Sequence, residues 1–172
     1  MKNLVLFSLI FMLISCFGNK NEFGVLKIDA PKGSTFKDEV MKNGVHFYSI
    51  KWKLKNEMTS VFSISKWPNE MSTSEMAPSV KEIIEDTFAV TKAQGKSKIE
   101  DDTKIQYSEI SEEFVSGNVA YFEHTSERGY QRILSVHMVS DGDVIWQGLF
   151  SGSKELFKEA MNIFKTMEPM NE

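Results

Sequence analysis

The chain has 172 residues, of which 41% are hydrophobic and 12% aromatic, with a formal net charge of −4 and one cysteine. This apolar content is typical of a globular protein and excludes an intrinsically disordered chain. The weakly negative charge, without a basic stripe, argues against a nucleic acid as partner.

The first feature in chain order is a short apolar segment that ends at the single cysteine. Lys2 provides a positive charge, residues 4–13 are mostly apolar, and Ser15 is the small residue before Cys16. About ten apolar residues are too few for a membrane-spanning helix, which needs ~20. An ordinary secretory signal would end in an Ala-x-Ala-like cleavage site, which the segment lacks.

The four residues Leu13-Ile14-Ser15-Cys16 resemble the lipobox of bacterial lipoproteins. The resemblance implies that residues 1–15 are a signal peptide and that the Cys16 thiol receives a diacylglycerol and becomes the new N-terminus. Acyl chains such as palmitate then hold the protein on the cell envelope, since each buried methylene contributes about 0.8 kcal/mol. Phe17 replaces the aspartate that favours inner-membrane retention in such proteins, so the outer membrane is favoured.

Removal of residues 1–15, including Lys2, leaves 157 residues with a net charge of −5. We expect residues 16–22 to be the lipidated cysteine and a polar tether, and residues 23–172 to be a single domain. With Cys16 lipidated, no thiol remains for a disulfide, a nucleophile or a thiolate metal site.

The first third of this domain is predicted to consist of strands. Segments rich in β-branched and aromatic residues alternate with Gly, Pro and Asn turns. The expected strands are residues 24–29, 45–54 and 58–67, and the expected turns are residues 31–34, 42–44 and 55–57. Pro68 ends the third strand because proline has no N–H to donate to a sheet.

Two segments have the period of an amphipathic helix. The first has an apolar stripe at Val80, Ile83, Ile84 and Phe88 and stops at Gly95. A capping box at residues 79–82 predicts its start, with Ser74 as an alternative start one turn earlier. Ser153 is predicted to cap the second helix, and Pro169 to close it. The second stripe consists of Leu156, Phe157, Ala160, Met161, Phe164 and Met167.

Between the helices, a charged linker (residues 96–104) precedes four predicted strands at residues 105–114, 119–125, 130–139 and 144–150. The short turns between them, at Gly117-Asn118, Arg128-Gly129 and Asp141-Gly142, predict an antiparallel meander. The expected fold class is therefore α+β: an antiparallel sheet of about six to seven strands with two main helices packed on it, covered at least partly on both faces.

This order of elements resembles the PsbP-like fold, an α/β/α sandwich found in an extrinsic subunit of photosystem II, a Ran-binding import factor and DcrB-type envelope lipoproteins. The resemblance covers residues 23–168 and includes the ending Phe150-Ser151-Gly152 followed by residues 163–167 (IFKTM). It implies a non-catalytic accessory or binding protein, although a fold alone does not establish a function.

The sequence contains no pattern that carries a known chemistry. His46, His124 and His137 have no partner at metal-ligand spacing. The acidic pairs Asp101-Asp102 and Glu112-Glu113 and the sequence Asp141-Gly142-Asp143 are expected in turns or linkers, and a hairpin turn explains the last of these better than a calcium loop. We therefore expect no catalytic residue, no metal and no cofactor.

Three aromatic residues are candidates for a ligand or partner surface. Tyr48, Trp52 and Trp146 are expected on an exposed sheet face or in a groove between sheet and helices, where aromatic side chains anchor partners. In the competing interpretation all three are buried in the core.

We expect a membrane-anchored, non-enzymatic envelope lipoprotein that binds a protein partner or an apolar ligand. One alternative is an immunity or inhibitor protein against a secreted toxin or hydrolase, which would also be small, acidic and anchored. Another is a hydrolase whose residues meet only in the fold.

Overall fold

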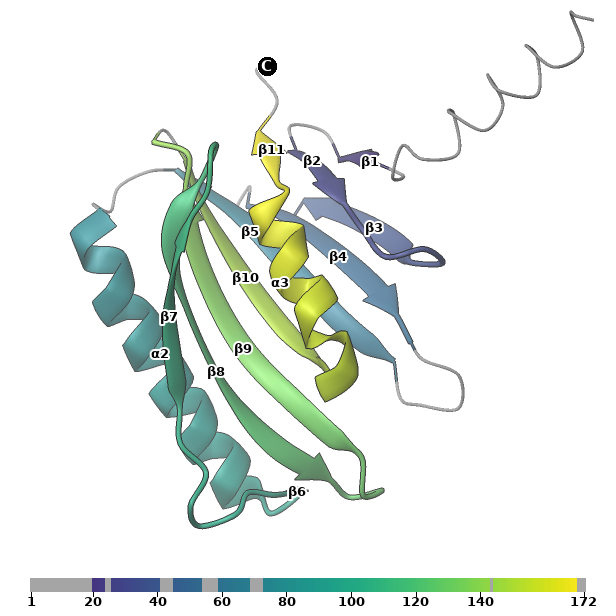
Figure 1. The fold of residues 1–172 in the computed structure, drawn as a ribbon, viewed down its shortest axis with the longest axis vertical. Coiled ribbons are helices and arrows are strands. Elements are labelled where there is room, and N and C mark those ends of the chain that lie inside the picture. The colour runs from purple at the N-terminus through teal and green to yellow at the C-terminus, as the bar shows by residue number, and fades with distance from the viewer. Residues whose placement is uncertain are drawn as a thin grey trace, which may run out of the picture.

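Residues 20–23, 26–40, 45–53, 59–68, 73–142 and 144–169 are described by a computed structural model, and they form two antiparallel sheets (Figure 1). Eight strands build the larger sheet, in the order β3-β4-β5-β10-β9-β8-β6, with β7 also paired to β8. These strands are β3 (Thr35–Val40), β4 (His46–Trp52), β5 (Ser60–Pro68), β6 (Ser97–Lys98), β7 (Gln106–Ser111), β8 (Ser116–Ser126), β9 (Gln131–Ser140) and β10 (Val144–Ser153). The smaller sheet has the order β1 (Lys20–Phe23), β2 (Leu26–Asp29) and β11 (Glu168–Pro169).

The predicted meander is confirmed, because β7, β8, β9 and β10 pair consecutively and antiparallel. Strand β10 then pairs with β5 along eight residues, from Val144↔Pro68 to Ser151↔Val61. This pairing joins the N-terminal hairpin strands and the meander into one sheet. Together with two helices it confirms the α+β class and the antiparallel sheet, with one strand more than the expected six to seven.

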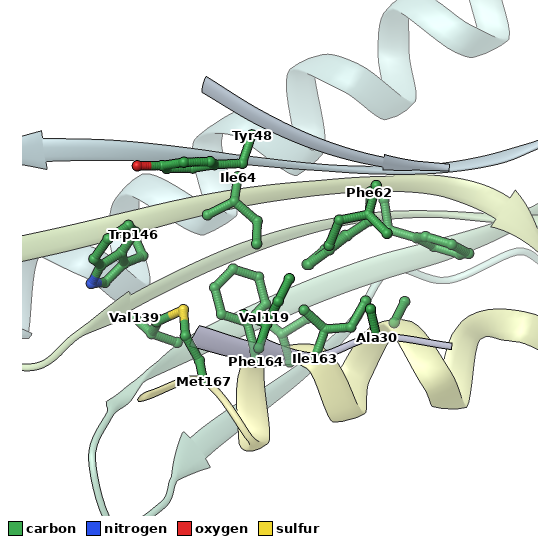
Figure 2. Packing of buried hydrophobic residues seen from close by; sticks show 14 of the residues in the cluster. Ala30, Tyr48, Phe62, Ile64, Val119, Val139, Trp146, Ile163, Phe164 and Met167 are labelled. Atoms are coloured by element: carbon green, nitrogen blue, oxygen red, sulfur yellow. The ribbon is translucent and has the colours of Figure 1, made fainter. Parts of the chain in front are cut away.

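Apolar residues cover both faces of the larger sheet. Helix α2 (Thr73–Gln94) packs on β8 and β9, where Val80 and Ile84 bury against Phe122 and Val136. On the opposite face, α3 (Phe157–Lys165) and β2 close a second core that contains Phe62, Phe150 and Phe164. Figure 2 shows this second core, with Ile163 and Phe164 between α3 and the sheet. The expected two-sided cover is therefore present.

Helix α2 starts at Thr73, so the alternative start near Ser74 is correct and the capping box at residues 79–82 is wrong. Pro78 lies inside the helix. The Ser79 hydroxyl donates to the Glu75 carbonyl at 2.9 Å, one helical turn back, and does not cap a helix start. Gly95, with φ of +64°, ends the helix as predicted, because glycine adopts this conformation without steric cost.

At the C-terminal end, the Ser153 hydroxyl accepts from the Glu155 N–H at 3.3 Å and caps a short 3₁₀ turn, η1 (Lys154–Leu156), that leads into α3. The predicted cap is therefore present on this turn, whereas α3 itself has Leu156 at its N-cap, without a side-chain hydrogen bond. Pro169 does not close the helix directly: α3 ends at Lys165, and Pro169 lies in β11, which pairs with Leu26 of β2.

Three other segments differ from the sequence-based expectation. Residues 20–22, predicted as tether, belong to β1, which pairs with β2 from Lys20↔Asp29 onward. The charged linker contains β6, which pairs with the end of β8. Strand β3 was not predicted, because its sequence TFKDEV lacks a clear apolar alternation.

Some predictions fall outside the described residues. They concern residues 1–16, with the lipobox and Cys16, and the turns at 42–44 and 55–57.

Candidate functional site: a groove between helix α2 and strand β7

The three aromatic residues proposed as a binding surface are all buried. Tyr48 and Trp146 are 1% exposed and Trp52 is 6% exposed, and all three belong to the core between α3 and the sheet. The prediction of an exposed surface at these residues is therefore wrong. The alternation of side chains in β4 and β10 does not indicate which face of the sheet α3 covers. In the structure α3 covers the face that carries Tyr48, Trp52 and Trp146.

The acidic residues of the β9–β10 hairpin have structural roles. Asp141 accepts from the Val144 N–H at 2.9 Å through Oδ1 and from the Trp146 Nε1–H at 3.4 Å through Oδ2. Asp143 of this hairpin lies outside the described residues. Glu112, in the turn between β7 and β8, pairs with Lys165 at 3.4 Å. In the part of the chain that the structure describes, no group of three or more His, Cys, Asp or Glu side chains is placed to hold a metal.

One serine–histidine contact brings potentially reactive groups together. Ser135 and His137 point from β9 into the core, with Oγ and Nε2 2.7 Å apart, and both are fully buried. Burial lowers the pKa of His137 to about 3, so its imidazole is neutral near pH 7. The His137 ring packs against Phe62 and Phe164, so neither group of the pair is open to solvent.

A groove lies between the first half of α2 and the edge strand β7. It has a volume of about 730 Å³, within the usual range for ligand sites. We call it the α2–β7 groove. It is lined by Ala77, Pro78, Val80 and Lys81 of α2, by Tyr107, Ser108 and Glu109 of β7, and by Asn118 and Val119 of β8.

Helix and strand place these side chains on opposite walls. Tyr107 and Glu109 alternate with Ser108, so they point to one face of the sheet, and their partners in the register are Ala120 and Asn118 of β8. Ala120 belongs to the core under α2, which identifies this face as the one that α2 covers. The walls are thus mainly apolar on the helix side and polar on the strand side.

Tyr107 is the main aromatic group of the groove, and half of its surface is exposed. Its hydroxyl donates to Glu85 Oε1 at 3.4 Å, which ties β7 to α2. Partial burial and the neighbouring Glu85 carboxylate raise the pKa of the phenol, so Tyr107 keeps its proton at neutral pH. A tyrosine held in this way presents a large apolar surface at a small cost in rotamer entropy.

Two opposite charges, Lys81 on α2 and Glu109 on β7, line the groove. Both side chains are exposed, and neither makes an ion pair or side-chain hydrogen bond with another described residue. Charged groups that flank an apolar floor are typical of a recognition surface, where they select the orientation of the partner.

Two other cavities at the described surface are smaller than this groove. One of about 340 Å³ lies between the end of β2 and α3, and one of about 260 Å³ lies beside the β9–β10 hairpin. The second is lined by Glu112 and Asp141, whose carboxylates are already bound within the fold. The α2–β7 groove is therefore the strongest candidate site.

The fold has a structural relative of undefined function. A crystal structure from Bacteroides thetaiotaomicron VPI-5482, at 1.50 Å resolution, is similar to 90% of this chain with a TM-score of 0.50 and 12% sequence identity. This likeness concerns the fold alone. The chain spans about half the length of that protein, since the match covers 49% of it. No protein-family model and no curated protein matches the sequence.

No helix within the described residues is both long and apolar enough to cross a membrane.

Sequence reasoning missed the groove because it depends on how α2 crosses the sheet. A local signal was present in Gln106-Tyr107-Ser108-Glu109, where a single aromatic residue lies among polar ones in the least regular of the predicted strands. The residues directly beside this tyrosine, Gln106 and Ser108, are polar and give no sign of its burial.

Proposed function

We propose that the chain is a lipid-anchored envelope lipoprotein whose domain binds a protein partner in the α2–β7 groove. The observation that carries this proposal is the groove itself, with its apolar helix wall and half-exposed Tyr107. It also contains two charges that have no ion pair or side-chain hydrogen bond with another described residue. The lipobox at Leu13–Cys16 supports the anchor, and Phe17 favours the outer membrane. The resemblance to DcrB-type lipoproteins of the PsbP-like fold supports a role by contact.

In this proposal the domain is not an enzyme. The Ser135–His137 pair, the serine–histidine contact within the described residues, is enclosed by aromatic rings and gives no support to a hydrolase. An immunity or inhibitor protein would use the same groove, and the identity of the bound partner would distinguish it from an accessory protein.

Replacement of the lipobox cysteine tests the anchor. Cys16→Ser removes the thiol that would carry the diacylglycerol, so we expect incorporation of labelled palmitate to fall to background and the protein to lose its processing in the native host. Equal labelling of the unchanged protein and the variant would contradict the anchor.

A photoreactive side chain in the groove tests the binding site in cells. A photoreactive phenylalanine replacing Ala77, which lines the groove, is expected to yield a covalent adduct with a second protein on irradiation. Ala89 lies on the same helix, is also exposed and does not line the groove, so the same replacement there is the matched control. Equal adducts from both positions, or none from Ala77, would contradict the proposed site.

A further inference from the structure

Strand β7 forms an open edge of the larger sheet. It pairs with β8 from Gln106↔Tyr121 to Ser111↔Ser116, and it has no other strand partner among the described residues. The other side of β8 is occupied by β9 along ten residues. The outer backbone N–H and C=O groups of β7 are therefore available to another extended strand.

The opposite edge of the same sheet is protected in a way that β7 is not. Strand β3 carries three consecutive exposed charges, Lys37, Asp38 and Glu39, which disfavour pairing with another strand. Strand β7 has one charge, Glu109, no proline and a continuous register without a bulge. Five of its six residues are exposed. The two edges thus differ in their capacity to accept a strand.

We propose that a second copy of this chain occupies the edge, with the two β7 strands paired antiparallel across a two-fold axis at Ser108. Residues opposite each other in such a pair point to the same face, so Tyr107 of each copy lies opposite Glu109 of the other. No like charges face each other in this register. A pair centred on Glu109 would instead place two carboxylates opposite each other.

The position of the chain start agrees with this arrangement. An axis perpendicular to the paired sheets leaves the layer of α3, β1 and β2 on the same side in both copies. Strand β1 starts at Lys20, four residues after Cys16. An extended chain of four residues is at most about 14 Å long. Both lipids of the proposed function therefore reach one bilayer. An axis within the sheet would direct them to opposite sides.

The dimer also extends the proposed binding site, on whose existence this part of the inference rests. The α2–β7 grooves lie on the sheet face that α2 covers, opposite α3 and the membrane side. Pairing of the β7 strands joins the two grooves into one trough between two α2 helices. The trough then contains Tyr107 and Glu109 of both copies, and each Tyr107 lies opposite the Glu109 of the other copy across the strand pair.

Sedimentation velocity on the chain from Phe17 onward, which contains every described strand and helix, tests the association itself. We expect a reversible monomer–dimer equilibrium between micromolar and millimolar protein. Ser108→Lys places two positive charges against each other on the axis, so the dissociation constant should rise at least about tenfold. Asp38→Lys on the β3 edge is the matched control and should leave it unchanged.

A thiol on the axis tests the register. Without Cys16, Ser108→Cys introduces the sole thiol of the chain, and mild oxidation should convert most of it to a disulfide-linked dimer. Asp38→Cys, also exposed and on an edge strand, should remain mostly monomeric. A monomer at every concentration, or equal cross-linking from both positions, would overturn the proposed dimer. The groove would still stand if Ala77 then gave an adduct with a different protein in cells.

Discussion

Replacement of Phe164 by alanine is expected to destabilise the fold by about 3–5 kcal/mol, the range for removing a fully buried phenylalanine. Phe164 is 0% exposed and lies in the centre of the core beneath α3 (Figure 2). Its ring meets that of Phe62 edge-on, with centroids 5.1 Å apart, and stacks on His137 at 4.9 Å. The alanine variant leaves a cavity between α3 and β10 that the surrounding rings cannot fill.

Urea unfolding of the chain from Phe17 onward measures this loss. Lys92→Ala is the control, because Lys92 is exposed at the end of α2 and its ion pair with Asp101, at 3.8 Å, is exposed as well. Such a pair contributes less than about 1 kcal/mol. Comparable losses for the two variants would mean that α3 does not pack on the sheet as described.

Acid is expected to destabilise the fold through His137. In the unfolded chain its pKa is near the usual 6.5, and in the fold burial lowers it to about 3. The unfolded state therefore binds the proton first as the pH falls. The stability that neutral His137 contributes is fully present above pH 6.5 and is lost as the pH falls toward the folded pKa. At ~1.36 kcal/mol per pH unit, the free energy of unfolding should fall by about 3 kcal/mol between pH 7 and pH 4.

A variant without a titrating group separates His137 from the other acid-sensitive groups. His137→Gln keeps a polar partner for the Ser135 hydroxyl but cannot take up a proton. It should be less stable than the unchanged protein at pH 7, because the stacking on Phe164 is lost, and it should lose less further stability between pH 7 and pH 4. Parallel stability curves for the two proteins over this range would show that His137 is not the acid-sensitive group.

Periodicity predicted the elements of the fold better than their contacts. The stripe of Phe157, Ala160 and Phe164 gave α3, and short turns gave the meander, because both signals are local. The start of α2 was harder to predict. Ser79 and Glu82 fit a capping box, but both lie inside the helix, and the Ser79 hydroxyl bonds to the Glu75 carbonyl. Strand β3 carries no apolar alternation and could not be predicted from its own sequence.

Glycines illustrate why contacts are harder to predict than elements. Gly117 was interpreted as a turn residue, but it lies inside β8, where an added Cβ would come within 2.0 Å of the Met138 carbonyl oxygen. At Gly148 a Cβ would lie 2.2 Å from the Phe164 ring. Both glycines permit close approaches between segments distant in sequence, so their roles become visible only in the assembled fold.

The candidate site depended on the same long-range information. Aromatic content pointed to Tyr48, Trp52 and Trp146, and the packing of α3 on the sheet buries all three. Tyr107 lies on an edge strand beside a helix that does not cover it fully, so it remains half-exposed. Strand order and helix placement determine which aromatic residues stay exposed. Neither can be predicted from local sequence.

Amide hydrogen exchange tests most directly whether the protein acts through the α2–β7 side of its domain. The measurement compares the protein in its native membrane with the dilute chain from Phe17 onward. We expect slower exchange in the membrane for Gln106–Ser111 of β7, and no change for Thr35–Val40 of β3, the other edge of the sheet. Equal exchange of β7 in both samples, or protection of β3 instead, would contradict a role for this side of the domain.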